Sequence, residues 1–136
     1  MRKLLVTTPA QSDLSNIHSY TQEHYGFLGA KAYDVVLKQA LLDLRDDPYR
    51  PGSKERPEID GNIRSYHTSF SRERAGSGVK SPRHFVLYFL PHDDEVVISR
   101  ILHDSCDLPR HIPVRHIKQA KKFTRNHSSK GKSHER

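Results

Sequence analysis

The hydrophobic and polar positions in the first part of the chain predict a short strand followed by a helix. The apolar run at residues 4–6 predicts the strand. Thr8, Pro9 and Gln11 then stand where helices place an N-cap, a first-turn proline and the glutamine of a capping box. Apolar residues follow at three- and four-residue spacing, at Ala10, Leu14, Ile17 and Tyr20 or Thr21. This stripe predicts a helix that ends near Gly26.

A second stripe with the same spacing begins after the segment Gly26 to Gly29. Its members are Ala30, Tyr33, Val36, Leu37, Ala40, Leu41 and Leu44. Asp46, Asp47 and Pro48 should end this helix, because proline cannot continue a helix and restricts the residue before it. Two amphipathic helices with a short connection predict an antiparallel hairpin whose apolar faces need a sheet to cover them.

Three strands are predicted in the second half. Tyr66, Thr68 and Phe70 alternate with polar residues, as in a strand with one buried face. Residues 85–90 and 96–102 are apolar at nearly every position, which is typical of adjoining central strands. Residues 71–81 predict a basic, flexible hairpin loop, and residues 105–113 predict a short helical turn.

Together these elements predict an α+β fold in a single domain, residues 1–113. Its parts are a short N-terminal strand, a two-helix antiparallel hairpin, a three-stranded antiparallel sheet and a short C-terminal helical turn. Residues 114–136 form a basic extension, which we expect to be partly helical and then disordered. This extension contains eight of the 23 basic residues and one of the 16 acidic residues, so the net charge of +7 arises there. It could contact nucleic acid non-specifically, or it could simply aid solubility.

Cysteine and apolar content indicate a cytoplasmic protein. Cys106 is the one cysteine, so neither an intrachain disulfide nor a cysteine-rich zinc site is expected. The apolar stretch near the start of the chain is too short for a signal peptide or a membrane span.

Several local strings resemble the ParE branch of the RelE/ParE toxins. They are residues 10–17, 20–26, 65–74, 81–85 and, most specifically, the run Arg-Ile-Leu-His-Asp-Ser-Cys-Asp-Leu at 100–108. The order of elements over roughly residues 3–113 is also similar to that family. The chain departs from the usual pattern in its extension from Val114 onward and in Cys106.

The resemblance implies the toxin of a type II toxin-antitoxin module, a plasmid-stabilisation function, inhibition of DNA gyrase by binding, and neutralisation by a ParD-like antitoxin. It implies neither an enzyme nor a cofactor. The RelE branch cleaves messenger RNA on the ribosome, so a RelE-type endoribonuclease is the alternative, and a non-toxic remnant that still binds antitoxin is another. The residue types required for RNA cleavage are present at His67, Arg72, Arg83, Tyr88, Arg100 and His103.

Candidate contact residues for the target or partner fall into two groups. Arg72, Arg74 and Arg83 lie in or next to the predicted loop. Arg100, His103 and Asp104 end the last strand, where they either order the end turn through an ion-pair network or form a functional set. No metal ligands are expected despite ten histidines, because their spacing matches no known site. Ser69 and Ser71 lack the sequence context of a hydrolase nucleophile, so no hydrolase is expected either.

Overall fold

A computed structural model describes residues 2–106 of this chain. The first strand, β1 (Lys3–Val6), leads almost directly into the helix α1 (Thr8–Asp46). Thr7 is the N-cap, one residue before the predicted position, and its Oγ1 accepts a hydrogen bond of 3.3 Å from the Ala10 N–H. Pro9 lies in the first helical turn, where its missing N–H leaves no helix hydrogen bond unmade.

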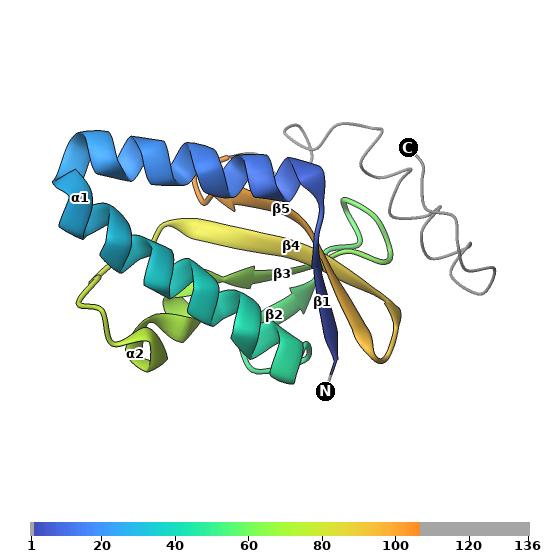
Figure 1. The fold of residues 1–136 in the computed structure, drawn as a ribbon. Helices are drawn as coiled ribbons and strands as arrows, with labels where there is room; N and C mark the ends of the chain where they lie inside the picture. Colours follow the sequence, from blue (N-terminus) through green and yellow to red (C-terminus); the bar gives the residue numbers. More distant parts are fainter. Residues whose placement is uncertain (1, 107–136) are drawn as a thin grey trace.

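The two predicted helices are the two arms of α1, which join at Gly26 (Figure 1). Gly26 has φ 82° and ψ 179°, a non-helical conformation that is essentially restricted to glycine. The predicted connection from Gly26 to Gly29 is wrong in length, because residues 27–29 are already helical. Across the bend, the Nδ1 atom of His18 lies 2.7 Å from the Oδ2 atom of Asp34 and links the arms.

One mixed sheet of five strands lies against α1, with the order β1-β5-β4-β3-β2. Its further strands are β2 (Ser53–Glu55), β3 (Arg64–His67), β4 (His84–His92) and β5 (Glu95–His103). β1 pairs in parallel with β5, and all other pairs are antiparallel. The α+β class is therefore confirmed, but the prediction of a three-stranded antiparallel sheet is wrong, because β1 and β2 join the sheet at its two edges.

The predicted strand through residue 70 ends early, at His67. Thr68–Ser71 forms a 3₁₀ helix, and α2 (Arg72–Ala75) follows it directly. Phe70 is therefore 54% exposed instead of facing the core. The basic loop predicted at residues 71–81 thus begins as a helical turn, and Ser77 fixes it to α1 by donating from Oγ to the Ala32 carbonyl over 2.8 Å.

The sheet has an apolar core on each face. The first core lies between the sheet and α1 and includes Leu37, Leu44, Tyr66, Val86, Tyr88, Val96 and Ile98. The second core contains Ile59, Ile63, Leu87, Phe89, Val97 and Leu102, so residues from the loop between β2 and β3 cover the opposite face. Within residues 2–106 we find no helix whose length and apolar content would suit a membrane span. The predicted end turn beyond Cys106, the boundary at residue 113 and the basic extension lie outside the described residues.

Candidate functional site

Polar side chains from α1 and three strands meet where β4 begins and β5 ends. We name this group the strand-end cluster, and its members are Tyr33, His67, Arg83, His84, His103 and Asp104. The antiparallel register brings His84 directly opposite His103. Their rings meet edge to face, with centroids 5.4 Å apart. Pairing between the strands therefore places three histidines in one small region.

Asp104 is the anionic centre of the strand-end cluster. The Arg83 Nε lies 3.0 Å from both carboxylate oxygens, and its Nη2 lies 2.9 Å from Oδ1. On the other side, the His67 Nε2 lies 3.0 Å from Oδ2. The hydrogen bonds from Arg83, with a smaller contribution from His67, lower the pKa of Asp104 to about 2. Asp104 therefore carries its negative charge throughout the physiological pH range.

Tyr33 and His84 form a second, more buried pair in the strand-end cluster. The Arg83 backbone N–H donates to the Tyr33 hydroxyl over 2.9 Å, so the hydroxyl hydrogen is free to donate to the His84 Nδ1 at 2.6 Å. Burial, with the adjacent His103 as a smaller cause, lowers the pKa of His84 to about 4. Burial likewise raises the pKa of Tyr33 above its usual value of about 10. At neutral pH both side chains are uncharged.

The strand-end cluster thus combines groups that can move a proton with a cation and a fixed anion. The side chain of Arg83 is 58% exposed, whereas the side chain of Asp104 is 19% exposed. Such a set can hold an anionic group or transfer a proton. Among residues 2–106 no group of three or more histidine, cysteine or acidic side chains is arranged to hold a metal ion.

Three of the six predicted contact residues, Arg83, His103 and Asp104, lie in the strand-end cluster. Arg100 does not, because its guanidinium bonds to Asp13 of α1. Tyr88, named for the RNase alternative, is buried in the core and donates its hydroxyl to the Pro48 carbonyl. The predicted grouping of Arg100 with its sequence neighbours therefore does not match the structure.

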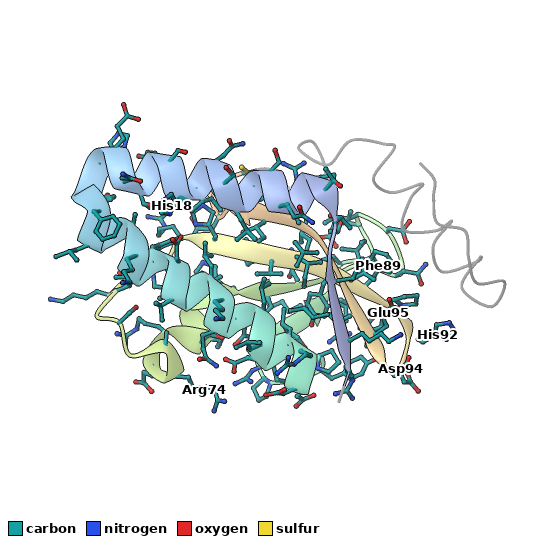
Figure 2. All side chains as sticks on the ribbon, in the orientation of Figure 1. His18, Arg74, Phe89, His92, Asp94 and Glu95 are labelled. Atoms are coloured by element: carbon teal, nitrogen blue, oxygen red, sulfur yellow. The ribbon has the colours of Figure 1, made fainter. Side chains whose placement is uncertain are left out.

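Arg72 and Arg74 lie on α2, apart from Arg83. The Nε of Arg74 donates to the Oδ1 of buried Asp43 over 2.9 Å, yet its side chain is 58% exposed at the edge of the molecule (Figure 2). Within residues 2–106, Arg72 makes no side-chain hydrogen bond or ion pair. Both arginines can therefore reach a partner from the same short helix.

Sequence reasoning missed Tyr33 and His84. Tyr33 reads as an apolar position of the helix stripe, and His84 lies just before the apolar run that predicted β4. The two residues share one feature in the sequence: each has an aromatic ring with a polar group, at a position expected to face the boundary between helix and sheet. That feature alone did not indicate a site. Their meeting depends on a contact between residues 51 positions apart.

Exposed apolar side chains gather where α1 bends. We name them the elbow patch, and they are Tyr20, Tyr25, Phe27 and Leu28. Leu28 is 76% exposed. Contiguous exposed apolar side chains of this size are uncommon on a protein that functions without a partner, so the elbow patch is a candidate contact surface.

Comparison with known proteins gives the family. A search of curated proteins found no match. The family model described as "ParE toxin of type II toxin-antitoxin system, parDE" matches residues 4–108, which include every strand and helix described above except the first residue of β1, Lys3. The match covers well over half of the 136 residues. The chain therefore belongs to the ParE family of toxins of type II toxin-antitoxin systems.

Proposed function

We propose that this toxin inhibits DNA gyrase by binding to it, without chemistry of its own, and that a ParD-like antitoxin neutralises it in the cytoplasm. The observation that carries the proposal is the family match over residues 4–108. Cells that lose a plasmid encoding both proteins would no longer make the antitoxin, and the remaining toxin would inhibit them. This effect would account for a role in plasmid stabilisation.

Accessible arginines support binding as the mode of action. Arg74 on α2 and Arg83 in the strand-end cluster each have side chains that are 58% exposed, and Arg72 is partly exposed on α2. Guanidinium groups are well suited to recognise carboxylates of a protein or phosphates of DNA held by that protein. Both anions are present in a gyrase–DNA complex. These three residues are therefore the proposed contacts with the target.

The elbow patch is the proposed contact with the antitoxin. An otherwise disordered antitoxin segment gains binding energy by covering apolar surface with its own apolar face. Tyr25, Phe27 and Leu28 supply exposed apolar surface of this kind next to the bend at Gly26. Phe27→Asp with Leu28→Asp should abolish co-purification with a ParD-like protein encoded beside the toxin, while Tyr49→Asp, at another exposed aromatic, should not. Equal retention by both variants would contradict this assignment.

The decisive experiment is supercoiling by purified gyrase with and without the full-length protein, scored for inhibition and for trapped cleaved DNA. We expect both effects, and Arg72→Gln with Arg74→Gln should weaken them relative to Lys54→Gln. Lys54 is an exposed cation on the edge strand β2 and serves as the matched control. Unchanged supercoiling at a large excess of folded protein would refute gyrase inhibition. A shortened chain that ends at Pro113 would show whether the basic extension contributes to DNA affinity at low salt.

The strand-end cluster favours one alternative, a RelE-type endoribonuclease. His67, His84, His103 and Arg83 supply the base, acid and cation that cleavage at a 2′-hydroxyl requires. Cleavage of a translated message by the purified protein, lost in His103→Gln, would establish this alternative. If expression is harmless and neither gyrase nor message is affected, the chain is a remnant that only binds antitoxin.

A further inference from the structure

Two members of the strand-end cluster, Asp104 and His67, form a chain of hydrogen bonds with the exposed Ser69, which lies outside that cluster. The Ser69 Oγ lies 2.8 Å from the His67 Nδ1, and the His67 Nε2 lies 3.0 Å from the Asp104 Oδ2. Ser69 is exposed, whereas the side chains of His67 and Asp104 are only 18% and 19% exposed. The hydroxyl thus faces solvent while the groups behind it are sheltered.

Backbone geometry fixes the proton on His67. The Ser69 N–H donates to the His67 Nδ1 over 3.1 Å, so this nitrogen carries no proton. The neutral ring therefore has its hydrogen on Nε2, which donates to Asp104. The Phe85 ring packs edge to face on the His67 ring, with centroids 4.9 Å apart and planes at 89°, and holds its orientation. The unprotonated Nδ1 therefore faces two donors of Ser69, the backbone N–H at 3.1 Å and the side-chain hydroxyl at 2.8 Å.

We propose that Ser69 is an activated nucleophile that takes the acyl group of a small carboxylic ester, with His67 as general base and Asp104 as the positioning residue. Ser69 Oγ attacks the ester carbonyl carbon while its proton passes to the His67 Nδ1. The bond to the leaving alcohol then breaks, and the alkoxide takes that proton from Nδ1. Water then attacks the acyl carbon while one of its protons passes to the His67 Nδ1. The bond from that carbon to the Ser69 Oγ breaks, Oγ takes the proton back from Nδ1, and the carboxylic acid leaves. This activity is separate from the proposed inhibition of gyrase.

The same protein contains an internal comparison. Ser105 Oγ lies 2.8 Å from the His103 Nδ1, the same local geometry as Ser69 and His67. Asp104 approaches His103 only at that same Nδ1, at 3.7 Å, so no carboxylate is seen behind the opposite ring nitrogen within the described residues. If the serine–histidine contact alone caused reactivity, both serines would react. If the aspartate behind the ring is required, only Ser69 will.

The test is labelling of the full chain with a biotinylated fluorophosphonate, with the modified serine located by tandem mass spectrometry. We expect modification at Ser69 and none at Ser105. His67→Gln, which keeps a donor toward Asp104 but has no base at the Nδ1 position, should lower the labelling rate roughly a hundredfold. Ser105→Ala should label at the wild-type rate. Equal labelling of both serines, or an unchanged rate in folded His67→Gln, would overturn the proposal.

A comparison of two variants at Asp104 guards against a change that merely prevents folding. Asp104→Glu should restore part of the rate lost in Asp104→Asn, a recovery that a purely structural role would not tie to labelling. An equal labelling rate in folded Asp104→Glu and folded Asp104→Asn would refute the role of Asp104. Release of p-nitrophenol from p-nitrophenyl acetate, lost in Ser69→Ala, would confirm acyl transfer.

Discussion

Arg100 and Asp13, 87 positions apart in the sequence, form two parallel hydrogen bonds that join the last strand to the first arm of α1. The Arg100 Nε lies 2.7 Å from Oδ2 of Asp13, and Nη2 lies 2.9 Å from Oδ1. The Ile101 backbone N–H donates to the same Oδ2 over 2.9 Å. The side chain of Asp13 is 11% exposed and its carboxylate accepts three hydrogen bonds, so its removal would leave three sheltered donors without an acceptor.

Asp13→Ala should therefore destabilise the fold by about 3 kcal/mol, as expected for a largely buried ion pair that loses one partner. Urea unfolding followed by circular dichroism measures the change in free energy of unfolding. The control is Asp34→Ala, whose pair with His18 is about 40% exposed at both side chains and should contribute less than about 1 kcal/mol. Equal losses in the two variants would contradict a structural role for the Arg100–Asp13 pair.

Asp43 should be the most sensitive acidic residue. Its side chain is fully buried and accepts hydrogen bonds from Ser71 at 2.6 Å, Gln39 at 2.8 Å and Arg74 at 2.9 Å. Asp43→Ala should cost roughly 3 to 5 kcal/mol of unfolding free energy, because it leaves these donors unsatisfied beneath α2. Arg74→Ala should cost about 1 kcal/mol, since its own side chain is 58% exposed. Thermal unfolding of both variants checks the order, and the reverse order would refute it.

His84 should make the fold sensitive to mild acid. Its pKa is lowered to about 4 in the folded protein and is about 6.5 in the unfolded chain, so only the unfolded state takes up this proton between those values. Stability should therefore fall as the pH decreases from 6.5 to 4. In His84→Asn, whose side-chain oxygen can replace Nδ1 as acceptor for Tyr33, the decline should be shallower. Urea midpoints at several pH values measure both slopes, and identical slopes would contradict the assignment to His84.

Gly26 should tolerate no other residue without a cost in stability. With φ 82° and ψ 179°, Gly26→Ala should lose about 1 to 3 kcal/mol through backbone strain alone, because no atom lies within 4 Å of the added methyl group. Gly61→Ala, also in open space but without a positive φ, should change stability by less than about 0.5 kcal/mol. Chemical denaturation of both variants tests the difference. An unchanged free energy of unfolding in Gly26→Ala would contradict the predicted backbone strain.

Periodicity predicted the elements whose burial follows from their own sequence. The two apolar stripes gave both arms of α1, and the apolar runs gave β4 and β5. β2 was missed, because Ser53-Lys54-Glu55 has no apolar residue and is a strand only through its pairing with β3. Phe70 was misplaced, because alternation cannot distinguish a strand from a 3₁₀ turn that begins two residues earlier.

The same reasoning predicted only part of the strand-end cluster. His103 and Asp104 stood out as neighbours in the sequence, and Arg83 and His67 were named separately, but nothing in the sequence showed that Asp104 binds both of them. Asp104 binds Arg83, 21 residues away, and His67, 37 residues away, through the register of three strands. The hydrophobic pattern of β3 and β4 does not give the register between them, because their connection contains a 3₁₀ helix and α2. The Ser69–His67–Asp104 chain is therefore recognisable only in the folded protein.

The parallel pairing of β1 with β5 joins segments from opposite ends of the described chain, Lys3 to Glu95 and Val6 to Ile98. A ribosome that adds 5 to 20 residues per second needs about 5 to 20 s to travel between these strands. During that interval the first strand lacks its partner, and the apolar side of α1 lacks part of the sheet that covers it. The time taken by synthesis therefore sets the earliest moment at which the fold of this toxin can close.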